Sequence, residues 1–173
     1  MQTPTVSPEA SAAPSYNAVE TNNQAGVSEA EYQKRRQEIL LVNLDHRLSN
    51  EYDAEDLVLI NDIINTSAVR SRSHESEMNK EAILAANTMF LAAERDGLSG
   101  FVITTAYRSY GFQHELYMRE DEPVNAEGWY SVVPPFASEH RTGLAMDVTN
   151  EQLVNSPDTL TDQFGESAQG KWL

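Results

Sequence analysis

Apolar residues recur at spacings of three and four between residues 78 and 96, which is the clearest periodicity in the chain. The residues concerned are Met78, Ala82, Ile83, Ala85, Ala86, Met89, Phe90 and Ala93. This spacing places apolar side chains on one face of an α-helix. Gly97 follows, and glycine commonly ends helices. The pattern therefore predicts an amphipathic helix over residues 78–96.

Two further segments downstream have clear patterns. Residues 101–106 (FVITTA) are rich in residues that favour strands. A helix over residues 112–120 is predicted to follow, so Arg108 is expected in the loop that opens from the strand. Residues 144–149 alternate larger and smaller side chains, which predicts a strand with Asp147 on the face opposite the larger ones.

The remaining patterns are shorter. Residues 39–43 are branched and apolar and predict a short buried strand, whereas residues 57–64 fit a strand or a helix. Ser28 and Glu31 form a capping box, which predicts the start of a short helix near Glu29. Residues 121–137 contain several prolines and a glycine, and they predict a long loop.

The first 27 residues differ from the rest in composition. They hold three prolines, two glutamates and no lysine or arginine, so they bury too little apolar surface to offset the entropy of ordering. We therefore expect a disordered linker over residues 1–27 and one domain over residues 28–173. The tail lacks the basic and apolar regions of a signal peptide, and the chain has no run of about 18 apolar residues to span a membrane.

Charge and cysteine content narrow the classes of function. The formal net charge of −15 disfavours nucleic acid and anionic membrane surfaces as partners. The chain has no cysteine, which excludes disulfides and thiolate metal sites. Histidine and carboxylate side chains are then the plausible strong metal ligands.

One decapeptide, residues 138–147 (SEHRTGLAMD), places His140 and Asp147 on either side of Gly143. Imidazole and carboxylate both suit Zn²⁺, and a catalytic zinc commonly has three protein ligands and an open position for water. Gly143 permits a backbone conformation that other residues avoid, which can fold the histidine back toward the aspartate. A loop histidine and a strand-end carboxylate are the alternative interpretation of the pair.

The motif SxHxxGxAxD is complete in this decapeptide, and residues 105–113 (TAYRSYGFQ) precede it in the expected order. Together these blocks resemble the VanY-type D-alanyl-D-alanine carboxypeptidases, zinc peptidases of bacterial cell-wall peptides. The resemblance extends loosely over residues 39–173. It implies an α+β fold in which helices pack on a small, mainly antiparallel sheet that carries a zinc site.

The resemblance also implies roles for individual residues. His140 and Asp147 would be zinc ligands, and Arg108 would point into the site. There Arg108 would either grip the substrate carboxylate with two parallel hydrogen bonds or stabilise the developing oxyanion. Gln113 and Ser138 would hold the substrate end, although Ser138 has the alternative of capping a turn.

Five other residues have weaker claims to a role. Trp129 and Tyr130 either wall a groove or pack under the loop. His46 and His74 show no ligand partner at a useful spacing, and the same holds for His114, although it lies beside Gln113.

The chain departs from the family pattern at its end. The family's third zinc ligand is a histidine, preceded three residues earlier by a glutamate general base, and residues 170–173 (GKWL) end before such a segment. We therefore expect a fragment that is inactive by itself. We also expect the intact protein to be exported or membrane-anchored through a removed N-terminal segment.

The function implied is a zinc-dependent carboxypeptidase of the cell envelope that removes C-terminal D-alanine from peptidoglycan stem peptides, with D,D or L,D specificity left open. The alternative is a module that binds these peptides without cleaving them.

Overall fold

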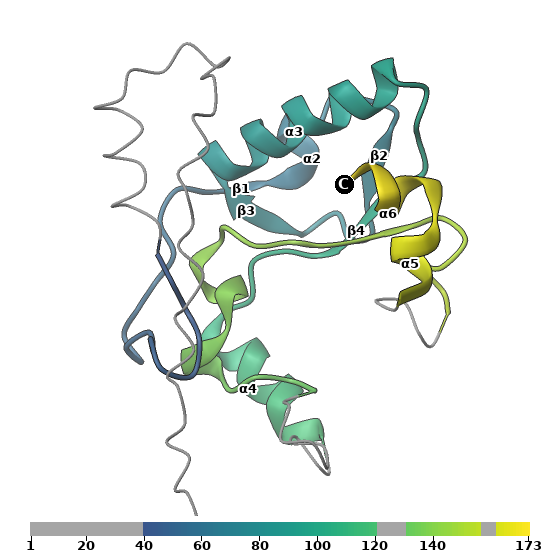
Figure 1. Cartoon of the computed structure of the whole chain (residues 1–173). Helices are drawn as coiled ribbons and strands as arrows, with labels where there is room; N and C mark the ends of the chain where they lie inside the picture. Colours follow the sequence, from purple (N-terminus) through teal and green to yellow (C-terminus); the bar gives the residue numbers. More distant parts are fainter. Residues whose placement is uncertain (1–39, 121–130, 157–161) are drawn as a thin grey trace, which may run out of the picture. The chain divides into compact units, whose positions relative to one another are not determined.

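The computed structural model describes residues 40–120, 131–156 and 162–173. Helices and short strands are mixed along the chain (Figure 1). In order, the elements are β1 (Leu57–Leu59), α2 (Ile60–Ile63), β2 (Val69–Ser71), β3 (Glu77–Asn79), α3 (Lys80–Arg95), β4 (Phe101–Thr105), α4 (Tyr110–Arg119), the 3₁₀ helices η1 (Pro135–Ala137) and η2 (Glu139–Thr142), β5 (Asp147–Asn150), α5 (Asp162–Glu166) and α6 (Ala168–Trp172).

The strands form two small sheets. β1 pairs with β3 antiparallel, and the second sheet has the order β2-β4-β5. Within the second sheet β4 pairs parallel with β2 and antiparallel with β5. The fold is therefore α+β with mainly antiparallel pairing, as the resemblance implied.

Helix α3 confirms the strongest periodicity in the sequence. The Asn79 side chain caps its first turn by accepting from the backbone N–H groups of Glu81 and Ala82, a pattern typical of asparagine at this position. Gly97 follows the helix with φ of 77°. The helix begins after residue 78, because Met78 belongs to β3, where it is buried.

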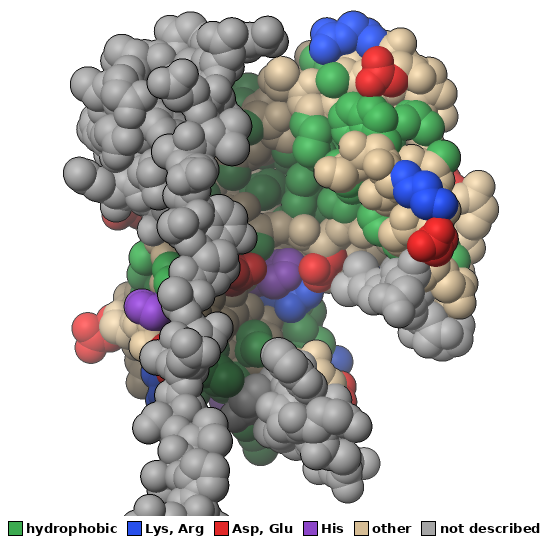
Figure 2. Space-filling model, in the orientation of Figure 1, with side chains coloured by type: hydrophobic (Ala, Val, Ile, Leu, Met, Phe, Trp, Pro, Cys, Tyr) green, Lys and Arg blue, Asp and Glu red, His purple; other side chains and the backbone are tan. Residues whose placement is uncertain are grey.

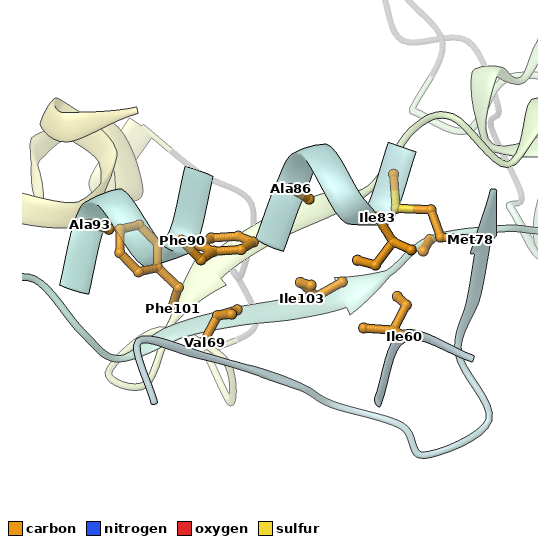
Figure 3. Close-up of a cluster of buried hydrophobic side chains, with 10 residues drawn as sticks. Ile60, Val69, Met78, Ile83, Ala86, Phe90, Ala93, Phe101 and Ile103 are labelled. Carbon is orange, nitrogen blue, oxygen red and sulfur yellow. The ribbon is translucent and has the colours of Figure 1, made fainter. Parts of the chain in front are cut away.

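The core lies between α3 and the sheet (Figure 3). Ile83, Phe90 and other apolar residues of α3 pack with Phe101 and Ile103 of β4. The Phe90 and Phe101 ring centroids are 5.4 Å apart. Trp172 of α6 covers the same place, with its ring centroid 6.1 Å from that of Phe101.

Two predicted strands need correction. Residues 40–43 form no strand, and Leu40 and Leu41 are exposed although Val42 is buried. The Asn43 side chain instead accepts from the backbone N–H groups of Asp45 and His46, which makes a turn. A strand needs a pairing partner as well as branched residues, and no element of the described chain pairs with this segment.

The strand predicted for residues 144–149 begins only at Asp147, and Leu144 is exposed. Asp147 pairs with Thr105, the last residue of β4, so residues 144–146 extend past the end of that strand. Residues 57–64, which fitted either element, contain both β1 and α2. The predicted helix over residues 112–120 is α4, which begins at Tyr110.

The predicted linker, the helix near Glu29 and residues 121–130 of the predicted loop lie outside the described residues. Within the described part of the chain, no helix is long and apolar enough to cross a membrane.

Candidate active site

His140 lies in η2, and both of its ring nitrogens face an acceptor. Nδ1 is 2.7 Å from the carbonyl oxygen of Ala106, and Nε2 is 3.3 Å from Asp147 Oδ1. A carbonyl only accepts, so Nδ1 carries the hydrogen and Nε2 presents its lone pair in the neutral ring. Metal-binding histidines are commonly held in this way.

The spacing of His140 and Asp147 fits a metal ion. Two acceptors that face each other need a cation between them, either a proton on the imidazole or a metal. Tetrahedral zinc with bonds of about 2.0–2.1 Å sets two ligand atoms about 3.3 Å apart. The observed 3.3 Å between Nε2 and Oδ1 matches that separation. Both side chains are largely buried, with 14% and 22% of their surface exposed.

Asp147 is placed by the pairing of β5 with β4, which sets it opposite Thr105. Its Oδ2 accepts from the Thr105 hydroxyl at 2.8 Å and from Arg108 Nη2 at 2.5 Å. Burial raises the pKa of the Asp147 carboxyl, but His140, the Thr105 hydroxyl and the Arg108 charge more than offset it, so the pKa lies below its usual value. The carboxylate is therefore ionised near neutral pH.

Arg108 follows β4, and most of its N–H groups donate hydrogen bonds to neighbouring side chains. Nε and Nη2 donate to Thr105 Oγ1, Nη2 also to Asp147 Oδ2, and Nη1 to Gln113 Oε1 at 3.3 Å. Burial lowers the pKa of the guanidinium and Asp147 opposes this, but arginine stays protonated in proteins. The five N–H donors of an arginine leave one on Nη1, so this arrangement favours a single directed donor over a two-pronged grip.

Gln113 lies in the first turns of α4, as predicted, and is fully buried. Its Nε2 donates to the Val133 carbonyl at 2.8 Å, while its Oε1 accepts from Arg108. Its contacts therefore hold Arg108 in place and leave one Nε2 hydrogen for a ligand.

Ser138 links η1 to η2 and is only 1% exposed. Its side chain caps neither helix, so the capping alternative is wrong. Its Oγ has no hydrogen-bond partner within the described residues. An unsatisfied buried hydroxyl costs free energy, which makes a ligand atom the natural partner for this one.

These five side chains line one cavity of about 820 Å³. Arg108, Gln113, Ser138, His140 and Asp147 share it with residues 42–45 and 131–133 among others. Figure 2 shows basic, acidic and histidine side chains gathered at the middle of the face drawn. The cavity is large enough for a short peptide end.

Gly143 has the backbone conformation that the sequence suggested. Its φ is 74°, and an added Cβ would lie 2.9 Å from Leu57 Cδ2. Its carbonyl accepts from the backbone N–H of Asn79 at 2.9 Å. The motif is thereby joined to β3 while η2 turns back toward β5.

The other histidines do not join the site. His46, His74 and His114 are exposed. Asn43 contacts His46, Asn61 contacts His74, and the Tyr110 ring stacks on His114. In the part of the chain that the structure describes, no group of three or more His, Cys, Asp or Glu is placed to hold a metal. Trp129 and Tyr130 lie outside it.

Sequence reasoning missed two contributors to the site, the Thr105 hydroxyl and the Ala106 carbonyl. Both belong to the block of residues 105–113 that carried the resemblance. Their role depends on which way the end of β4 faces, which sequence spacing does not reveal.

Comparisons with known proteins agree on the family. The sequence profile of VanY, described as D-alanyl-D-alanine carboxypeptidase, matches residues 75–173. YodJ of Bacillus subtilis (strain 168), which is assigned as a carboxypeptidase, is 33% identical over 139 residues, covering 78% of this chain and 47% of YodJ. The chain thus spans about half the length of this relative.

Solved structures are similar as well. The LdcB LD-carboxypeptidase matches with a TM-score of 0.58 and 31% identity, covering 76% of this chain and 59% of LdcB. VanYB in complex with D-alanine-D-alanine matches with a TM-score of 0.47 and 22% identity, covering 73% and 68%. From the profile match, the two sequence blocks and the fold, we conclude that this chain belongs to the VanY family of D-alanyl-D-alanine carboxypeptidases.

Proposed function

We propose that this protein is a zinc-dependent carboxypeptidase that removes C-terminal D-alanine from peptidoglycan stem peptides in the cell envelope. The proposal rests on His140 Nε2 and Asp147 Oδ1, two possible metal ligand atoms that lie 3.3 Å apart. The other polar atom of each side chain already has a hydrogen-bond partner. Family membership and the likeness to the LdcB LD-carboxypeptidase support the choice of substrate.

The described residues supply two of the three ligands that a catalytic zinc normally has. Zinc in such a site polarises a carbonyl and makes water nucleophilic near neutral pH. Nε2 of His140 and Oδ1 of Asp147 would hold it. The third ligand and the general base are assigned to residues outside those described.

The remaining side chains of the cavity act on the peptide end. The Ser138 hydroxyl donates to the terminal carboxylate, which gives this buried group the partner that it lacks among the described residues. Arg108 directs its remaining Nη1 hydrogen and its charge at the carbonyl oxygen, where negative charge develops during attack. Gln113 keeps Arg108 in this orientation and offers its second Nε2 hydrogen to the carboxylate.

Zinc binding is the first test. In a protein that includes the third ligand, His140→Ala and Asp147→Ala are each expected to abolish stoichiometric zinc, because a lost ligand leaves an incomplete coordination shell. Bound metal is measured by elemental analysis after dialysis, with His114→Ala as the control because that histidine is exposed. Zinc retained near one equivalent in either ligand variant would contradict the assignment.

The reading frame beyond the codon for Leu173 provides the second test. A glutamate followed three residues later by a histidine would supply the base and the third ligand. That longer protein is then assayed for D-alanine release from a tetrapeptide and a pentapeptide, which separate L,D from D,D cleavage. A stop codon, or peptide binding without release, would instead favour a module that binds wall peptides.

A further inference from the structure

The hydroxyl of Thr105, at the end of β4, contacts two oppositely charged side chains of the site, Asp147 and Arg108. Its Oγ1 donates to Asp147 Oδ2 at 2.8 Å and accepts from Arg108 Nη2 at 2.7 Å and Nε at 3.2 Å. A threonine hydroxyl has one donor and two acceptor positions, so these contacts use all of them. We propose that Thr105 is a positioning residue, which orients the metal-binding carboxylate and Arg108 together.

The contact with Asp147 decides which carboxylate oxygen faces His140. Thr105 and Arg108 both bind Oδ2, and Oδ1 is left 3.3 Å from His140 Nε2. Arginine and carboxylate otherwise favour a two-pronged pair that uses both oxygens. Two of the contacts of Arg108 go to the Thr105 hydroxyl instead, which keeps Oδ1 available. Because the metal site belongs to the proposed function, the role of Thr105 rests on that function.

The contact with Arg108 likewise fixes the direction of a group that would face the substrate. Thr105 holds the Nε and Nη2 edge of the guanidinium, and Gln113 holds Nη1 from the other side. The guanidinium plane is therefore fixed before a ligand enters, which lowers the entropic cost of using its last hydrogen. One hydroxyl thus sets the direction of a metal ligand and of a substrate donor.

The irregular pairing of β4 with β5 explains why Thr105 rather than Thr104 has this role. The register shifts between Ile103 and Thr105, and Thr105 lies opposite Asp147. The hydroxyl of Thr104 donates only to the backbone oxygen of Asp147, at 3.3 Å. Both threonines are half-buried, so Thr104→Val is a matched control for Thr105→Val.

The first measurement needs no metal. In ¹H–¹⁵N NMR spectra of the 173-residue chain, the Arg108 Nε–H signal is expected to exchange slowly with water because the group is bound and largely buried. Thr105→Val removes its acceptor and should make exchange fast, whereas Thr105→Ser and Thr104→Val should leave it slow. Unchanged protection in Thr105→Val would overturn the proposal.

The second measurement is zinc affinity by competition with a chelator, in a protein that includes the third ligand. Loss of a residue that orients a metal ligand typically weakens metal binding by about 10- to 100-fold, and this is expected for Thr105→Val but not for Thr105→Ser or Thr104→Val. Wild-type affinity in Thr105→Val would also overturn the proposal. If Thr105→Val does not fold, Thr105→Ala removes the same hydroxyl without adding a methyl group in its place and is measured instead.

The two measurements separate two kinds of failure. If the wild-type protein with all three proposed ligands takes up no zinc, the proposed function is contradicted, and the exchange of Arg108 Nε–H still decides whether Thr105 holds that side chain. A wild-type chain that binds zinc with an affinity that Thr105→Val does not lower contradicts the role of Thr105 alone.

Discussion

Strand β4 changes character along its length. Phe101, Val102 and Ile103 at its beginning are fully buried and apolar, whereas Thr104 and Thr105 at its end are half-buried and lead into Arg108. The first half packs under α3, and the second contacts Asp147 through polar side chains. The core half fixes where the strand lies, so the polar half can hold charged groups in a defined geometry.

Substitutions in the two halves of β4 should therefore have different consequences. A core residue contributes mainly to the free energy of unfolding through buried apolar surface. A polar residue at the site contributes mainly to binding and turnover, because its contacts fix reacting groups. Each prediction below tests whether the two halves can be separated in this way.

Phe101→Ala is expected to have the largest effect on stability. Truncation of a buried phenylalanine typically lowers the free energy of unfolding by about 3–5 kcal/mol, and Phe101 contacts both Phe90 and Trp172. Urea unfolding followed by circular dichroism measures the loss. Leu84→Ala on the exposed face of α3 is the control and should change stability by less than about 1 kcal/mol. A comparable loss of stability in both variants would contradict the structural role given to the buried half of β4.

Arg108→Lys tests the polar half in a protein that contains the proposed third ligand and general base. Lysine keeps the charge but cannot contact Thr105, Asp147 and Gln113 at once. Loss of one positioned donor typically lowers turnover by about 100- to 1,000-fold, and kinetics with a peptide ending in D-alanine measure this. The matched control is Arg70→Lys, because Arg70 pairs with Glu151 at the exposed surface. Unchanged turnover in Arg108→Lys would remove the arginine from the mechanism.

Gly143→Ala should have the smallest effect, on the stability of the turn that joins residues 138–147 to β3. A side chain with positive φ costs about 1–2 kcal/mol, and the added Cβ would also press on Leu57. Thermal unfolding measures the loss of stability. Gly111→Ala is the control, because a Cβ there would meet nothing within 4 Å, and alanine favours a helix. If the two variants were equally stable, alanine could adopt the backbone conformation of position 143 as easily as glycine does.

Much of the fold could be predicted from the sequence where the pattern is long and periodic. Helix α3 and strand β4 occur where residues 78–106 predicted them. Residues 40–43 failed as a strand because branched apolar residues favour a strand only when another strand pairs with them. Strand β5 begins only at Asp147 for the same reason, because β4 ends at Thr105 and leaves residues 144–146 without a strand to pair with.

Residue types at fixed spacing were enough to identify the family, the candidate ligands His140 and Asp147, and the need for a glycine at position 143. The contacts of Thr105 and of the Ala106 carbonyl with those ligands, and the single hydrogen that Arg108 has left to offer, exist only in the folded chain. These facts depend on the register between β4 and β5. Register is set by the packing of whole strands and their side chains, so the local sequence around each residue does not contain it.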